Sequence, residues 1–204
     1  HIQLNFHGVY SYARVWVNGE FIREHYGGFT KWSCNITDII EAGENAVLTV
    51  EIVDRVDDLS YASGYAKHQI GGILRDVELT ALPKQHFEKL FFHTDFDENF
   101  QNATLKVNYC LSENSPVILK FELFDSDGSL VNLYKENVEL QEGNIDIDVK
   151  SPREWNAEKP YLYDLFITLK DQQGNTLEVI PHKVGFRKVE IKNGRFLVNG
   201  KQVL

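Results

Sequence analysis

The fold is decided by residues 105–123, which read LKVNYCLSENSPVILKFEL. In both halves of this stretch, apolar side chains alternate with mostly polar ones at every second position. Such an alternation is typical of strands that bury one face and expose the other to water. Strands at this spacing with turns between them favour a β-sandwich or a β-barrel.

The same pattern continues outward in both directions. Further apolar stripes of period two fall at residues 48–52, 145–149 and 163–169. Asn-Gly or Asp-Gly pairs, which accept the positive φ angles of tight turns, occur at 18–19, 127–128, 193–194 and 199–200. The only helix that the sequence favours is short, from Thr37 as N-cap to Ala42, with Gly43 after its end. We therefore expect an all-β protein.

Two positions divide the chain. Pro83 closes one series of strands, and a proline suits a domain exit because it cannot donate to a β-ladder. A new series begins near Phe87 and ends at residues 185–187. We interpret the chain as three pieces: 1–83, 84–187 and a C-terminal hairpin at 188–204.

The composition limits the classes of partner that the chain is expected to bind. The chain has 204 residues, 43% of them hydrophobic and 25% charged, which is ordinary for a globular protein in water. Its net charge of -9 repels phosphate backbones and anionic lipids, so we expect neither a nucleic acid nor a membrane partner. Cys34 and Cys110 are interpreted as unpaired core residues, which leaves cytoplasm and periplasm both open.

The sequence offers no obvious catalytic constellation. Its seven histidines are scattered, and it contains no HExxH, no Gly-x-Ser-x-Gly and no phosphate loop. The acidic residues at 57–58, 95–98 and 146–148 are interpreted as solvated surface charges. We therefore expect no catalytic residue, no metal site and no cofactor in this chain.

Several segments together form a recognisable pattern. They are FHGV at 6–9, ARVWVNGE at 13–20, GGFT at 27–30, GGILRDVEL at 71–79, PREWNAEKPYLY at 152–163, VGFRKVE at 184–190 and GRFLVNGK at 194–201. Each is weak alone, since a Val-Asn-Gly triplet is usually just a turn. In this order and spacing, the chain resembles the front part of glycoside hydrolase family 2 of β-galactosidase type.

The resemblance implies an architecture and a function. Residues 1–83 would be a partial sugar-binding jelly roll of galactose-binding type, with 71–79 as its last strand, lacking the strands that precede His1. Residues 84–187 would be an immunoglobulin-like sandwich, and 188–204 would lead into a catalytic TIM barrel. The parent enzyme would hydrolyse O-glycosidic bonds with retention, using two glutamates beyond Leu204. This chain would be inactive alone and would support and orient the barrel.

The resemblance also implies partners and site residues. The partners would be a carbohydrate substrate, the chain's own catalytic domain and possibly a second copy; any divalent or monovalent cation would belong to the barrel. The loop at 57–69 would reach toward substrate through Tyr61, Tyr65, Lys67, His68 and Gln69. The acidic position of the family's loop is occupied here by Gly64 or Ala66, which leaves the sugar open.

Five further residues are expected to be structural. Gly71 and Gly72 allow close backbone approach or a positive φ. Arg75 is expected to pair with a carboxylate or carbonyls on a neighbouring element. Trp155 is expected to plug the domain junction, and Arg187 to tie the second domain to the barrel. Two alternatives remain: a free-standing carbohydrate-binding module, and a structural immunoglobulin-like pair from a cell-surface protein.

Overall fold

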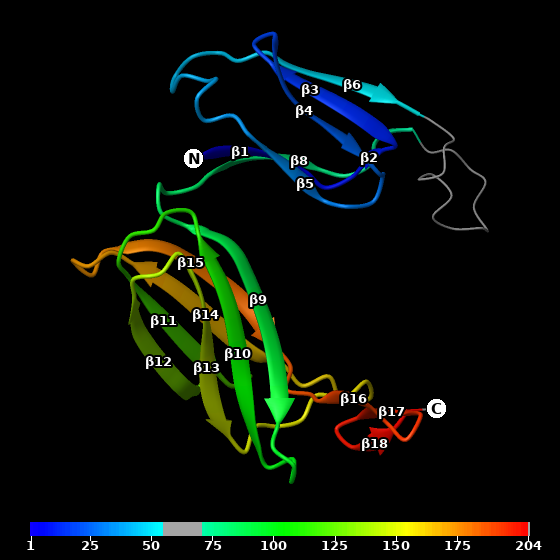
Figure 1. Ribbon diagram of the computed structural model, residues 1–204, viewed down its shortest axis with the longest axis vertical. Coiled ribbons are helices and arrows are strands. Elements are labelled where there is room, and N and C mark those ends of the chain that lie inside the picture. The colour runs from blue at the N-terminus through cyan, green and yellow to red at the C-terminus, as the bar shows by residue number, and fades with distance from the viewer. Residues whose placement is uncertain (55–70, 204) are drawn as a thin grey trace. The chain divides into compact units, whose positions relative to one another are not determined.

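The computed structural model describes residues 1–54 and 71–203, and within these ranges it contains strands and turns but no helix. The expected all-β class is thus confirmed (Figure 1). Contacts divide the chain into two compact units, which we call the first unit, residues 1–82, and the second unit, residues 83–204. In the described part of the chain, no helix is long and apolar enough to cross a membrane.

The first unit is built from short antiparallel strands. They are β1 (Ile2–Phe6), β2 (Val9–Tyr10), β3 (Tyr12–Val17), β4 (Glu20–Tyr26), β5 (Trp32–Asn35), β6 (Leu48–Val53), β7 (Gly72–Ile73) and β8 (Val77–Ala81). They form the sheets β5-β1-β8, β4-β3-β6 and β2-β7. The inward side chains of β1, β3 and β5 meet in one core, where the ring of Trp32 stacks on that of Phe6 at 4.2 Å.

Two expectations for this unit are wrong. Residues 37–42 form turns rather than a helix, and the hydroxyl of Thr37, the expected N-cap, accepts a hydrogen bond from Ile2 N at 2.9 Å. Residues 71–79 are two short strands in different sheets, since the chain leaves β7 after Ile73 and starts β8 at Val77.

The second unit is a two-layer sandwich. Its strands are β9 (Phe87–Phe96), β10 (Asn102–Leu111), β11 (Val117–Phe124), β12 (Leu130–Val138), β13 (Glu142–Lys150), β14 (Tyr163–Lys170) and β15 (Thr176–Val184). The sheets β13-β10-β9 and β12-β11-β14-β15 face each other (Figure 1). The two halves of the stretch at 105–123 lie in opposite sheets, so both apolar stripes meet in the core.

The chain continues into a small sheet at its C-terminal side. Strands β16 (Val189–Lys192), β17 (Arg195–Val198) and β18 (Lys201–Gln202) form an antiparallel sheet, which we call the C-terminal meander. We expected a single hairpin here. A second one is added because Asn199 adopts φ 50 and Gly200 φ 72, as Asn193 and Gly194 do at the first turn.

Candidate functional site

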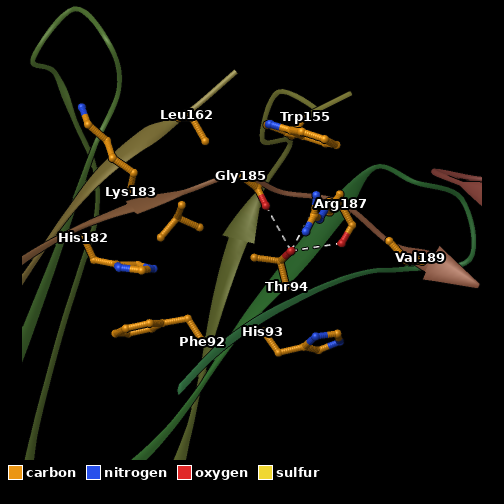
Figure 2. Close-up of a pocket in the computed structure, with 11 residues that line it drawn as sticks. Phe92, His93, Thr94, Trp155, Leu162, His182, Lys183, Gly185, Arg187 and Val189 are labelled. Carbon is orange, nitrogen blue, oxygen red and sulfur yellow. Dashed lines mark hydrogen bonds between the residues drawn. The ribbon is translucent and has the colours of Figure 1, made fainter. Parts of the chain in front are cut away.

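Two hollows in the second unit share Trp155, Arg187 and Val189 in their walls. The smaller hollow, of about 490 Å³, lies among β9, β15 and the segment around Trp155 (Figure 2). The larger hollow, of about 810 Å³, lies between that segment and the C-terminal meander.

Trp155 is positioned by the strand end beneath it. Its backbone N donates to the carbonyl of Phe186 at 2.8 Å, and the neighbouring Glu154 forms a parallel bridge to the same residue. The indole ring covers Gly185, where a Cβ would lie 2.8 Å from the ring atom Cδ1. Only a glycine lets the ring approach the backbone this closely.

Arg187 is fixed through hydrogen bonds of its main chain, and its side chain contacts Trp155. Its backbone N donates to Thr94 Oγ1 at 3.1 Å. The same hydroxyl lies 3.0 Å from the carbonyl of Arg187 and 3.2 Å from that of Gly185, so it can donate to either (Figure 2). The guanidinium lies over the Trp155 ring, with Cζ 4.6 Å from its centroid, which is cation–π geometry.

The smaller hollow has a basic lining. Besides Arg187, it is lined by His93, His182 and Lys183 (Figure 2). The His182 ring stacks on Phe92 at 4.3 Å, and burial there lowers the pKa of His182. Lys183 pairs with Asp164. Because the lowered pKa favours neutral His182 and Lys183 is paired with Asp164, the Arg187 guanidinium is the group of this lining that suits an acidic side chain.

The larger hollow presents apolar side chains on an anchored sheet. Phe196, Val189 and Val203 are 47%, 50% and 49% exposed. Buried Asn199 holds the meander, since its Nδ2 donates to the carbonyl of Trp155 at 3.0 Å and its Oδ1 accepts from Lys188 N at 2.8 Å. These side chains therefore face solvent from a fixed position.

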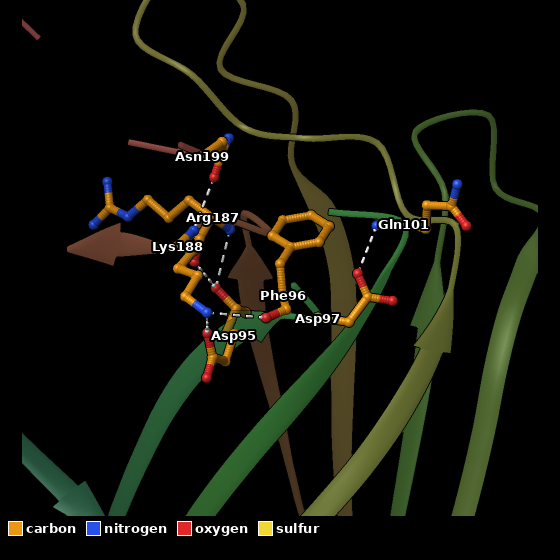
Figure 3. A network of polar contacts seen from close by, with 8 residues as sticks. Asp95, Phe96, Asp97, Gln101, Arg187, Lys188 and Asn199 are labelled. Atoms are coloured by element: carbon orange, nitrogen blue, oxygen red, sulfur yellow. Dashed lines mark hydrogen bonds and ion pairs between the residues drawn. The ribbon is translucent and has the colours of Figure 1, made fainter. Parts of the chain in front are cut away.

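Lys188 continues the same anchor onto β9. Its Nζ lies 3.5 Å from Asp95 Oδ1 and donates to the carbonyl of Phe96 at 3.3 Å (Figure 3). Asp97, the next acidic residue, accepts from the backbone N of Gln101 at 2.8 Å, and this bond lowers the pKa of Asp97. Both carboxylates are thus occupied with holding loops.

The structure places the other expected site residues as follows. The loop candidates Tyr61, Tyr65, Lys67, His68 and Gln69 lie outside the described residues. A Cβ on Gly71 would lie 2.9 Å from Asp54 Oδ2, and Gly72 has φ 111, so each glycine has a separate reason. Arg75 lies exposed between β7 and β8, where its alkyl chain approaches Gly8.

Trp155 and Arg187, both expected to be structural, line the two hollows. Trp155 is only half-buried and lines both hollows, so it is a wall residue as much as a packing residue.

Within residues 1–54 and 71–203, no group of three or more His, Cys, Asp or Glu side chains could hold a metal ion. Cys34 is buried and Cys110 half-buried, and both thiols are free.

Sequence reasoning missed two residues that build this site. Thr94 is a polar residue in the inward series of β9, where Phe92 and Phe96 are its apolar neighbours, and that break in the stripe was a usable signal. Asn199 was interpreted only as a turn residue. Nothing local shows that its amide also reaches Trp155, 44 residues earlier.

Known proteins resemble this chain along its whole length. The family model described as "Glycosyl hydrolases family 2, sugar binding domain" matches residues 1–83, and that described as "Glycosyl hydrolases family 2" matches residues 85–187. A β-galactosidase of Halalkalibacterium halodurans is 33% identical over 203 residues, which is 98% of this chain and 20% of the relative. A β-galactosidase of Clostridium acetobutylicum is 32% identical over 201 residues, 98% of this chain and 22% of the relative.

Solved structures show the same relation. A crystal structure of a Bacteroides uniformis β-glucuronidase superposes with a TM-score of 0.86 at 29% identity, covering 98% of this chain and 26% of that one. The chain thus spans about a fifth of the length of the curated relatives it matches.

Proposed function

Since this chain belongs to glycosyl hydrolases family 2, we propose that it is the non-catalytic N-terminal portion of an O-glycosyl hydrolase of β-galactosidase type. The observation that carries the proposal is that β-galactosidases about five times as long match it over 98% of its length. The parent enzyme then cleaves its glycosidic bond with retention of configuration, through two carboxylates supplied by the remaining chain.

The role of this portion is to hold and orient the catalytic domain. The surface around Trp155 and Arg187 supports this role, because it combines exposed apolar side chains with the Arg187 guanidinium. Covering apolar surface stabilises an interface by about 25 cal/mol per Å². Arg187 has its guanidinium on an exposed ring face, where an acidic group of the catalytic domain can pair with it.

We further propose that the parent enzyme acts on a galactoside and that the loop at 57–69 contacts it. Tyr61, Tyr65, Lys67, His68 and Gln69 offer rings for stacking and donors for sugar hydroxyls. The relatives named β-galactosidase favour a galactoside, and the β-glucuronidase neighbour makes a glucuronide the natural comparison. A free-standing carbohydrate-binding module is the alternative, and it predicts no catalytic domain in the coding sequence after Leu204.

Hydrolysis assays test the division of labour. We expect the 204-residue chain to release no nitrophenol from nitrophenyl β-galactoside or nitrophenyl β-glucuronide. We expect the full-length protein encoded by the gene to hydrolyse nitrophenyl β-galactoside faster than nitrophenyl β-glucuronide. Turnover by the 204-residue chain that survives repurification, and that a substitution within the chain abolishes, would refute the non-catalytic assignment.

The docking role is tested in the full-length protein with two arginine variants. Arg187→Ala should lower the melting temperature of the catalytic domain, because it removes a contact at the proposed interface. Arg153→Ala is the matched control, since Arg153 also lies over a ring, that of Tyr161 at 4.8 Å, but lines neither hollow. Equal shifts for both variants would show that the surface around Arg187 is not the interface.

A further inference from the structure

The outward face of the sheet β4-β3-β6 carries two aromatic pairs with a charged row between them. We call this surface the β3 face. Strand register defines it, since residues directly opposite each other point to the same side. Its three rows are Tyr26–Tyr12–Val53, Glu24–Arg14–Glu51 and Phe21–Trp16–Thr49.

The first aromatic pair lies near the β3–β4 turn. The rings of Trp16 and Phe21 meet edge-on, with centroids 5.6 Å apart and planes at 63°. Phe21 is 52% exposed. The Phe21 ring, half in water beside the indole, gives an exposed apolar ring surface, and the indole N–H is a hydrogen-bond donor.

The second pair lies at the other end of β3. The rings of Tyr12 and Tyr26 have centroids 4.5 Å apart, and Tyr26 is 46% exposed while Tyr12 beneath it is 2% exposed. Positions 12 and 16 are four residues apart on one strand, so the two pairs lie about 13 Å from each other. The face therefore has two apolar platforms in a line.

The row between the platforms is rich in hydrogen-bonding groups. Arg14 Nη1 lies 3.3 Å from Glu51 Oε2, and Arg14 Nε lies 3.8 Å from Glu24 Oε2. The Tyr12 hydroxyl donates to Glu24 Oε2 at 2.7 Å and bonds with Arg14, so the row is held in place. The side chains of Arg14, Glu24 and Glu51 remain 42%, 48% and 46% exposed, which leaves donors and acceptors open to a ligand.

We propose that the β3 face binds a neutral oligosaccharide. Sugar rings have an apolar C–H face and a rim of hydroxyls, so the platforms of Trp16 and Tyr26 fit the faces and the Arg14 row fits the hydroxyls. The family model for residues 1–83 is described as sugar-binding, which names a ligand class but no position. The binding needs no hydrolysis and does not rest on the catalytic proposal.

Other ligand classes fit this face less well. Two glutamates against one arginine make the middle row acidic, which opposes nucleic acid and anionic lipid. The cores of protein interfaces are depleted of charged residues, whereas the centre of this face is a charged row. A neutral ligand with many hydroxyls is not repelled by the acidic row and can form hydrogen bonds with its charged side chains.

The test is a titration of the isotope-labelled 204-residue chain with β-1,4-galactotetraose or cellotetraose, followed by NMR chemical shifts. We expect saturable shifts confined to β3, β4 and β6, with a dissociation constant that changes little between low and high salt. Trp16→Ala should weaken binding roughly tenfold, which corresponds to about 1.4 kcal/mol. Phe91→Ala is the control, because Phe91 is 64% exposed but lies in the second unit.

Two further variants keep the test decisive if Trp16→Ala fails to fold. Phe21→Ala and Glu51→Gln alter half-exposed side chains of the face and should each weaken binding several-fold. The proposal is overturned if neither glycan gives saturable shifts, if the shifts lie elsewhere, or if these variants bind as tightly as Phe91→Ala. Shifts on the β3 face that depend only on protein concentration would assign it instead to self-association.

Discussion

The two units share one sequence pattern but bury it to different extents. In the second unit, the alternating strands β10 and β11 bury their apolar side chains almost completely, and Leu105 and Leu119 are both 0% exposed. In the first unit, β6 and β8 carry apolar residues that stay in water, with Leu48 at 41% and Leu79 at 66% exposure. An alternating strand is therefore buried only where another layer covers it.

The core clusters reflect this difference. Among the described residues, the cluster of the second unit contains 21 buried side chains and that of the first unit nine. Because stability follows apolar area removed from water, the second unit should be the more stable one. We expect two thermal transitions, the lower from residues 1–82, and we expect residues 83–204 to fold alone.

Core truncation gives the largest effect and tests the assignment of the transitions. Phe6 and Phe121 are 0% and 1% exposed, each in the cluster of its own unit. Phe6→Ala and Phe121→Ala should each cost about 3–5 kcal/mol. In calorimetry, Phe6→Ala should lower only the first transition and Phe121→Ala only the second. A single transition that moves with either variant would mean that the two units unfold as one.

Adding a methyl group at two glycines should destabilise the protein less than the core truncations do. The two variants compare how easily the neighbouring ring can move in each unit. A Cβ on Gly28 would lie 2.2 Å from Cδ2 and 3.0 Å from Cγ of the buried Tyr10 ring. A Cβ on Gly185 would lie 2.8 Å from Cδ1 of Trp155, which is half-exposed and can shift. Within the usual range of about 1–3 kcal/mol, Gly28→Ala should cost more than Gly185→Ala. Urea midpoints measure this order, and the reverse order would contradict it.

Lowering the pH should change the melting temperatures of the two units to different extents, and this is the smallest of the expected effects. In the second unit, hydrogen bonds within turns lower the pKa values of Asp97, Asp127 and Asp171, and the Tyr161 hydroxyl lowers that of Asp125. In the first unit, His7 lowers the pKa of Glu78. A carboxyl with a lowered folded pKa stabilises fully above its unfolded pKa, about 3.9 for aspartate, and this stability is lost as pH falls through the folded pKa. The second transition should therefore fall more steeply below about pH 4.

A conservative variant checks the cause of that pH dependence. Asp171 accepts from Asn175 Nδ2 at 2.7 Å and from the backbone N of Asn175 at 2.8 Å; an asparagine keeps one oxygen to accept the backbone bond and does not titrate. Asp171→Asn should therefore flatten the pH dependence of the second transition between pH 2 and 6 and leave the first unchanged. Melting curves across this range measure it, and an unaltered slope would assign the dependence to other groups.

Local sequence patterns determined the parts of the structure that depend on near neighbours. Period-two alternation at 105–123 gave strands, because successive side chains of an extended chain point to opposite faces. The Asn-Gly pairs at 193–194 and 199–200 gave tight turns, since both residue types tolerate positive φ. Family membership was likewise readable from ordered motifs, whose residues were visible in the chain itself.

Tertiary structure decided what depends on residues far apart in the chain. Strand β1 pairs with β5 and β8, which begin 30 and 75 residues after Ile2, and no local pattern states that order. The hydroxyl of Thr37, the expected N-cap of a helix, instead accepts from the backbone N of Ile2, 35 residues earlier. Thr94 and Asn199 support the Trp155–Arg187 surface through long-range contacts. Thr94 on β9 accepts from the backbone N of Arg187, and Asn199 of the C-terminal meander donates to the carbonyl of Trp155. The bridge between Glu154 and Phe186 joins these two segments. Periodicity shows which face of a strand is apolar, but the partner that covers it is chosen by long-range packing and hydrogen bonding.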